Sequence, residues 1–183
     1  MAIKDLKKHK MWVGLQFSDS LIAKQIKRYT KIYYPDAGDR IASHVIAVIY
    51  HHRKFYVYES TIAENKKEGL NSGCRHYPLK KFFKLEENAI NQYVLYPINF
   101  NFEILDKNLG NAYAYGQIKD LMLSATFKKK KPSPDRVGKI CSEFLADAYL
   151  PIQKYFNLKS WQITPIHWQR YCEEQKLDSV TFY

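Results

Sequence analysis

Cys141 begins a segment that could place a nucleophilic thiol at the start of a helix. Residues 139–150 read KICSEFLADAYL, and Leu145, Ala148 and Tyr149 recur at the spacing that brings side chains onto one helix face. The first N–H groups of a helix lack backbone partners, and the positive end of the helix dipole favours a thiolate over a thiol. The alternative is an inert, packed cysteine, because free cysteines are among the most buried residues.

Two other side chains could complete a catalytic set with this thiol. His44 lies in the apolar, β-branched run SHVIAVIY at residues 43–50, and Glu59 lies near the end of KFYVYES at residues 54–60. A short polar turn separates the runs, so they predict an antiparallel hairpin in which these two ends share one sheet edge. We therefore expect His44 and Glu59 to be able to pair. Cysteine catalysis needs a thiol, a base that takes its proton and a group that orients the base.

The elements that must position these residues follow from hydrophobic periodicity and from capping and turn residues. A serine-containing N-cap cluster precedes one helix, and Thr164-Pro165 is a typical start for another. We expect the regions 33–40 and 61–75 to be irregular, and 151–158 to be a connector. The predicted strands are 10–17, 43–50, 54–60 and 91–97, with 179–183 as an edge strand or tail, and the predicted helices are 21–29, 78–83, 101–110, 112–123, 139–150 and 166–175.

Composition bounds the class of protein. The chain has 183 residues, 46% of them hydrophobic, which is enough for one domain with a real core over residues 1–183. Its three cysteines are widely spaced, which argues against a disulfide framework and fits a reducing compartment. Neither a secretory signal nor a stretch of ~20 apolar residues is visible, so we expect no integral membrane segment and a cytoplasmic location. A phage or viral protein would look the same.

The charge of the chain points to anionic partners. The formal net charge is +11, and four lysines in succession, Lys128, Lys129, Lys130 and Lys131, come shortly before Cys141. Two prolines follow the lysines closely, so this stretch does not continue a helix. The run could be a solvated loop, or it could bind an anionic substrate.

At the candidate residues, the sequence resembles the circularly permuted branch of the NlpC/P60 papain-like superfamily (the YiiX/LRAT-like branch). In this branch the histidine, the acid and a tyrosine precede the cysteine, as they do here. The resemblance covers most of the chain and rests on SHVIAVIY with His44, FYVYES with Glu59, GNAYAYGQI with Tyr113, CSEFLADAY with Cys141, and ITPIHW.

The resemblance implies an α+β, circularly permuted papain-like fold, with a small, curled antiparallel sheet packed against helices. It implies that Cys141 is the nucleophile, that His44 is the general base and later the general acid, and that Glu59 orients His44. Tyr113 would line the site and donate to the oxyanion. Ala114 stands where family members often carry Asp, which leaves Tyr115 as an alternative.

The implied reaction is hydrolysis or acyl transfer at an amide, ester or thioester bond, without a cofactor. Related families act on cell-wall peptides and on lipid acyl groups. We therefore expect a small-molecule, lipid or peptide substrate that could be anionic, and the sequence leaves the choice among these, and the oligomeric state, open.

Two other interpretations compete with this one. The first is a basic module that binds nucleic acid or an anionic surface through an inactive papain-like fold. Nucleic acid is the less favoured partner, because the aromatic residues fall mostly in apolar strand runs. The second is a metal site built from Cys74 and His76 with one of His44, Cys141 or Cys172, although the spacing of these residues is poor for a metal site. We expect Cys172 to be packed rather than reactive.

Overall fold

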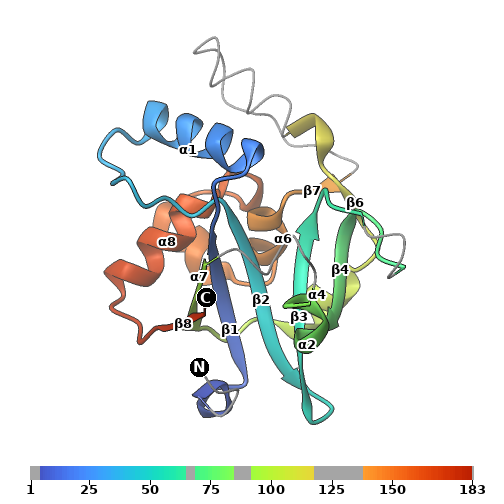
Figure 1. Ribbon diagram of the computed structural model, residues 1–183. Helices are drawn as coiled ribbons and strands as arrows, with labels where there is room; N and C mark the ends of the chain where they lie inside the picture. The colour runs from blue at the N-terminus through green and yellow to red at the C-terminus, as the bar shows by residue number, and fades with distance from the viewer. Residues whose placement is uncertain (1–4, 65–68, 85–91, 118–137, 183) are drawn as a thin grey trace.

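The computed structural model describes residues 5–64, 69–84, 92–117 and 138–182 (Figure 1). Its centre is a six-stranded sheet with the strand order β4-β3-β2-β1-β5-β8, in which every neighbouring pair is antiparallel. The fold class α+β is therefore confirmed. The strands are β1 (Met11–Phe17), β2 (His44–His51), β3 (Lys54–Thr61), β4 (Gly73–Pro78), β5 (Gln92–Pro97) and β8 (Val180–Phe182).

Helices and a short parallel strand pair surround this sheet. The pair consists of β6 (Ala112–Tyr113) and β7 (Gly138–Lys139). None of the described helices is long and apolar enough to cross a membrane. The helical elements are η1 (Asp5–Lys8), α1 (Leu21–Tyr33), α2 (Leu79–Phe82), α4 (Phe102–Lys107), α6 (Cys141–Asp147), α7 (Leu150–Phe156), η3 (Ser160–Gln162) and α8 (Pro165–Glu174).

Apolar residues cover both faces of the sheet. Alternate residues of the central strands point to opposite faces, as the two-residue period of a strand requires. On one face, Val45 and Ala47 belong to the core cluster that contains α6, α7 and α8 residues such as Phe144 and Trp168. On the other face, Ile46 packs with residues of η1 and α2. The helix α6 is consequently held between the sheet and the remaining helices.

The strands β2 and β3 separate at the end of the sheet where the candidate residues lie. Their pairing runs from His51 opposite Lys54 to Ala47 opposite Tyr58. Beyond that point, β2 continues beside β1 only, while the last residues of β3 pair only with β4. Helix α6 packs against both β2 and β3. The start of α6 can therefore reach the place where the two strands part.

Helix α1 lies across this same end of the sheet (Figure 1). It begins where β1 ends because Ser20 is its N-cap, with Oγ accepting a hydrogen bond of 3.2 Å from the N–H of Ala23. The side chains Ala23, Tyr29 and Thr30 are buried, whereas Leu21 is exposed. The helix thus packs one face against the rest of the protein and forms one wall of the candidate site.

Most of the predicted elements are present, and three predictions were wrong. Part of the supposedly irregular segment 61–75 is the start of β4, whose mixed polar and apolar residues hide its strand period. The expected connector 151–158 is largely α7, because a proline in the first turn of a helix is favourable and does not break it. The predicted helix 112–123 begins instead as β6, and its residues 118–123 lie outside the described part.

Candidate active site

Cys141 is the first residue of α6 and is 5% exposed. The preceding residue, Ile140, is the N-cap and has no side chain that could accept from the first helical N–H groups. The backbone N–H groups of Ser142 and Val45 instead act on the sulfur of Cys141 and help to lower the pKa of its thiol. These donors stabilise a negative charge on sulfur, so the uncapped helix start favours a thiolate.

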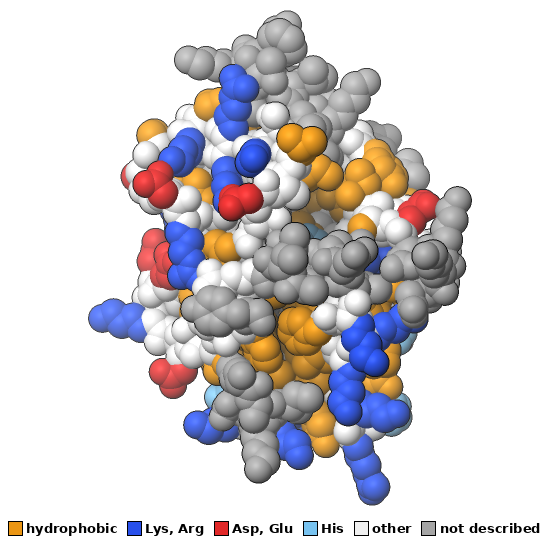
Figure 2. Space-filling model, in the orientation of Figure 1, with side chains coloured by type: hydrophobic (Ala, Val, Ile, Leu, Met, Phe, Trp, Pro, Cys, Tyr) orange, Lys and Arg blue, Asp and Glu red, His pale blue; other side chains and the backbone are white. Residues whose placement is uncertain are grey.

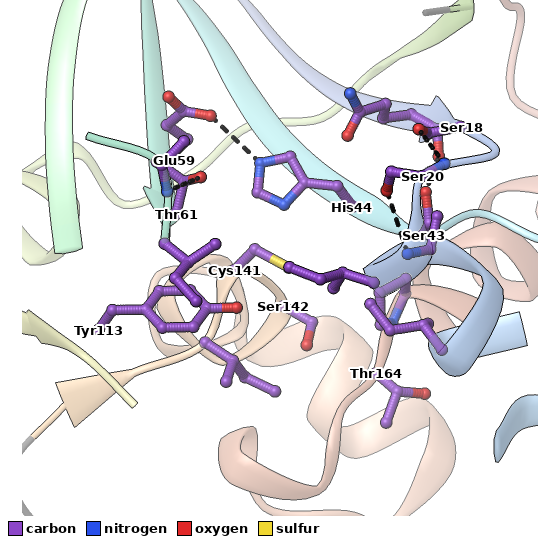
Figure 3. Close-up of a pocket in the computed structure, with 18 of the residues that line it drawn as sticks. Ser18, Ser20, Ser43, His44, Glu59, Thr61, Tyr113, Cys141, Ser142 and Thr164 are labelled. Carbon is purple, nitrogen blue, oxygen red and sulfur yellow. Dashed lines mark hydrogen bonds and ion pairs between the residues drawn. The ribbon is translucent and has the colours of Figure 1, made fainter. Parts of the chain in front are cut away.

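His44 links this thiol to Glu59. Its Nε2 lies 3.2 Å from Oε2 of Glu59, and the thiol of Cys141 is near enough to raise the pKa of the imidazole. Because Nε2 faces the carboxylate, Nδ1 is the ring nitrogen that points toward Cys141 (Figure 3). His44 therefore stands between Glu59, to which it is hydrogen-bonded, and the thiol of Cys141.

Glu59 is 3% exposed and is held by residues of β4 as well as by His44. The Nε and Nη2 atoms of Arg75 donate to its Oε1 at 3.0 and 2.9 Å, and the hydroxyl of Tyr77 donates to the same oxygen. Arg75 stands directly opposite Glu59 in the β3–β4 register. The carboxylate is thus fixed on one side and offers its other oxygen to His44.

The electrostatics of the three groups favour an ion pair between Cys141 and His44. Burial by itself lowers the pKa of His44, but the charge and hydrogen bond of Cys141, followed by those of Glu59, raise it to about 10. Burial by itself raises the pKa of Cys141, but the charge and hydrogen bond of His44 and the two backbone donors bring it below its ordinary value. Burial likewise opposes ionisation of Glu59, and His44, Arg75 and Tyr77 together lower its pKa.

Tyr113 reaches the same site from β6, and its hydroxyl points into the pocket (Figure 3). Burial, and then the negative charge of Cys141, raise its pKa, so the hydroxyl keeps its proton and can donate. Tyr115 is 50% exposed and does not line the pocket, although its ring meets that of Tyr113 edge to face at 5.5 Å. Of the two tyrosines, the structure brings only Tyr113 to the site.

Gly138 permits the close strand pairing that places Tyr113. A Cβ atom at this position would lie 2.7 Å from the carbonyl oxygen of Ala112 and 2.7 Å from the carbonyl carbon of Tyr113. Real Cβ atoms do not approach backbone so closely, so any larger residue would push β6 away from β7. Gly138 therefore helps to position Tyr113, because it allows β7 to pair closely with β6.

A cavity of about 210 Å³ opens onto Cys141, His44 and Tyr113. One wall is apolar and belongs to α1, through Ile22, Ala23, Ile26 and Tyr29. Hydroxyl groups line the rest of the cavity surface, and one of them, that of Thr30, also belongs to α1. These are the side chains of Ser18, Ser20, Thr30, Ser43, Thr61, Ser142 and Thr164.

Ser142 is the most informative of these hydroxyl residues. Its side chain is fully buried, and its Oγ has no hydrogen-bond partner among the described residues. A buried hydroxyl without a partner is unfavourable, so this one is available to a molecule that enters the cavity.

The structure does not bring together every residue that the sequence singled out. The lysine run Lys128–Lys131 lies outside the described residues. Cys74 is buried while its neighbour His76 is exposed, and no group of three or more described His, Cys, Asp or Glu side chains could hold a metal ion. The metal interpretation is therefore unsupported in the described part of the chain. Cys172 is packed in the core, as expected.

Sequence reasoning missed Arg75 and Tyr77. The only signal for them is the alternation of Arg75 and Tyr77 along a strand that would stand opposite Glu59. That signal becomes visible only once residues 73–78 are recognised as β4.

Comparison with known proteins does not assign the chain to a family. No protein-family model matches the chain, and no curated protein is significantly similar to it.

Proposed function

We propose that this protein is a cysteine-dependent hydrolase or acyltransferase that acts on an amide, ester or thioester bond through Cys141, His44 and Glu59. The observation that carries the proposal is the placement of His44 between two groups: its Nε2 lies 3.2 Å from Oε2 of Glu59, and its Nδ1 points toward the thiol of Cys141 (Figure 3). The lowered pKa of Cys141 and the raised pKa of His44 both favour the ion pair that nucleophilic catalysis needs, an ionised thiol beside a protonated imidazole.

In the first half of the reaction, the thiolate of Cys141 forms a C–S bond with the carbonyl carbon of the substrate. The carbonyl oxygen becomes an oxyanion, for which the hydroxyl of Tyr113 and the unpartnered hydroxyl of Ser142 are candidate donors. The bond to the leaving nitrogen, oxygen or sulfur then breaks, and the Nδ1–H of His44 supplies the proton that this atom takes. The acyl group remains on Cys141 as a thioester.

In the second half, water or another nucleophile attacks the thioester while the now neutral His44 takes its proton. The C–S bond breaks, which releases the acyl product and restores the pair of Cys141 thiolate and His44 imidazolium. Glu59 stays ionised throughout and holds the imidazole in one orientation through Nε2.

We also propose that the fold is a circularly permuted papain-like fold. Three observations support this assignment. The residues follow the order His44, Glu59, Tyr113 and Cys141 along the chain, the cysteine begins a helix, and that helix packs on an antiparallel sheet. The assignment agrees with the proposed reaction, because the papain-like architecture places a helical cysteine beside a histidine on a strand.

The apolar wall and the size of the cavity indicate the kind of acyl group. A cavity of about 210 Å³ lined on one side by α1 suits a small or medium apolar group next to the scissile carbonyl. We therefore expect short-chain acyl substrates to react faster than long-chain ones when the two are compared side by side.

Acylation by p-nitrophenyl acetate tests the proposal directly. We expect intact-mass spectrometry to detect one acetyl group, and peptide mapping to find it on Cys141. The Cys141→Ala and His44→Ala variants should remain unmodified over the same period, whereas the control variant Cys74→Ala should be acetylated at the wild-type rate. Equal acetylation of wild type and Cys141→Ala would contradict the proposal and would leave the inactive binding module as the better interpretation.

A further inference from the structure

A second cavity, of about 400 Å³, lies at the end of the sheet opposite the candidate active site. His44 begins β2 at the active-site end, and this cavity surrounds the turn that follows the other end of β2. Lys and Arg side chains gather over this turn and α2 at the lower right of Figure 2, beside an apolar area. The residues that line the cavity are Lys7, Tyr50, Arg53, Lys54, Phe55, Pro78, Leu79 and Lys80.

Four cationic side chains from three separate segments converge on this cavity. Lys7 belongs to η1, Arg53 and Lys54 to the β2–β3 hairpin, and Lys80 to α2. All four are exposed. Among the described residues, no acidic side chain lines the cavity and none forms an ion pair with any of the four. Their mutual repulsion is therefore uncompensated within the described structure, and an anion would relieve it.

The floor of the cavity is apolar and aromatic. Phe55 and Leu79 are 7% and 3% exposed, and the ring of Tyr50 packs against that of Phe55 with their centroids 4.9 Å apart. A cavity with cations at its rim and an aromatic floor suits a ligand that has an anionic group and an apolar part. A simple inorganic anion would leave the floor in contact with water.

The backbone of the hairpin turn supplies an independent reason to assign a role to Arg53. His52 and Arg53 both have positive φ values, of 45° and 62°, between the paired residues His51 and Lys54. Two-residue turns of this kind strongly prefer Asn-Gly, because residues with large side chains are strained there. The chain instead places an arginine at the glycine position, and this arginine lines the cavity. Strain that persists at such a position is typical of functional sites.

We propose that this cavity binds a phosphate ester that carries an apolar or aromatic group. A phosphate monoester has a charge close to −2 and several acceptor oxygens, so it can engage several cations at once. The planar guanidinium of Arg53 matches two phosphate oxygens, and the three lysines supply further charge. The apolar group would lie on Tyr50, Phe55 and Leu79. This chemistry occurs both in soluble phosphorylated compounds and in phospholipid headgroups.

Calorimetric titration of the full chain with phenyl phosphate tests the proposal without any need for enzymatic activity. We expect saturable binding that weakens with added salt and is about tenfold tighter than the binding of inorganic phosphate, since the ring is buried on the cavity floor. Sedimentation with phosphatidic acid vesicles, with phosphatidylcholine vesicles as reference, separates the two ligand sources. Vesicle binding together with weak phenyl phosphate binding would assign the site to a headgroup.

The double variant His52→Asn, Arg53→Gly gives the sharpest test. It relieves the backbone strain while it removes the guanidinium, so we expect a higher melting temperature together with at least tenfold weaker binding of phenyl phosphate. A melting temperature at or above that of the wild type would show that the loss of binding does not come from unfolding. The pair Lys107→Ser, Lys154→Ser removes two exposed lysines elsewhere and should bind as wild type does. Equal losses in both double variants, or no saturable binding to phenyl phosphate or vesicles, would overturn the proposal.

Discussion

Cys141 and Cys172 are both buried, with exposures of 5% and 0%, yet their surroundings act on the thiol in opposite directions. Cys172 lies inside the helical core, where burial and then the charge of Glu173 raise its pKa. At Cys141, the same cost of burial is outweighed by His44 and by two backbone N–H groups. Burial alone therefore makes a cysteine inert, and only specific partners make a buried thiol reactive.

Two buried carboxylates, Glu59 and Glu143, also have pKa values shifted in opposite directions. Glu59 is 3% exposed and has a lowered pKa because His44, Arg75 and Tyr77 all stabilise its charge. Glu143 is 6% exposed, and burial raises its pKa to about 7 because Lys139 compensates only in part. Its Oε2 has no hydrogen-bond partner among the described residues. Glu59 thus differs from Glu143 in the number of groups that stabilise its negative charge. Removing a partner of Glu59 should therefore destabilise the fold, and removing the charge of Glu143 should stabilise it.

The largest effect is expected from Arg75→Met. This change leaves the buried carboxylate of Glu59 without its two guanidinium hydrogen bonds, which should lower the free energy of unfolding by about 3–5 kcal/mol. The control is Arg170→Met, because Arg170 pairs with the exposed Asp36 and its loss should cost at most about 1 kcal/mol. Urea denaturation of both variants measures the difference. Similar losses would mean that the partners of Glu59 are not what sets this region apart.

A smaller effect, of the opposite sign, is expected from Glu143→Gln. The pKa of Glu143 is about 7 in the folded chain against an ordinary 4.5, so the wild type loses stability as pH rises between these values. The variant carries no such charge and should be more stable than wild type above pH 7, by up to about 3 kcal/mol. The advantage should disappear below pH 4.5, where the carboxyl is protonated in both states. Urea unfolding curves of both proteins at pH 4 and pH 8 measure this advantage. A stability difference between variant and wild type that does not change with pH would refute the raised pKa of Glu143.

The smallest effect on stability is expected from Tyr77→Phe. Removing one donor to Glu59 should cost about 1–2 kcal/mol, because Arg75 and His44 still hold the carboxylate. Tyr58→Phe is the matched control, since the hydroxyl of the buried Tyr58 makes no hydrogen bond with another described residue. Its loss should cost less than about 0.5 kcal/mol. Equal losses of unfolding free energy in Tyr77→Phe and Tyr58→Phe would show that the hydrogen bond from Tyr77 to Glu59 does not stabilise the fold.

The hairpin that brings His44 to Glu59 could be predicted because its causes are local. Two β-branched and aromatic runs flank a short polar turn, which predicts an antiparallel hairpin with its outer ends at the same edge of the sheet. The strands part beyond Ala47 and Tyr58, and the side chains of His44 and Glu59 meet across that gap. The capped start of α1 at Ser20 and the start of α8 at Thr164 are equally local. His44, Glu59 and Cys141 were therefore predictable, because each lies near the end of a strand or helix that its local sequence indicates.

The rest of the site depends on pairing between distant segments. The strand β4 exists because it pairs with β3 across the intervening segment, and only that pairing gives Arg75 and Tyr77 their role. Tyr113 was expected on a helix, but it lies on β6 because Gly138 lets β7 approach closely. Neither relation leaves a periodic signal in the sequence. The cationic cavity at the hairpin turn likewise combines three segments that nothing in the local sequence connects.

The central claim is that His44 and backbone N–H groups make Cys141 a thiolate at neutral pH. The most direct measurement is the rate of iodoacetamide alkylation of each cysteine, resolved by peptide mass spectrometry, over pH 5–10 in wild type and in His44→Ala. We predict that Cys141 alone reacts quickly in the wild type, with a midpoint well below 9.0, and that His44→Ala slows it about 100-fold at pH 7, where a thiol of ordinary pKa is about 1% ionised. Cys141 would contradict the account if it reacted like an ordinary thiol in both proteins, or no faster than Cys74 and Cys172.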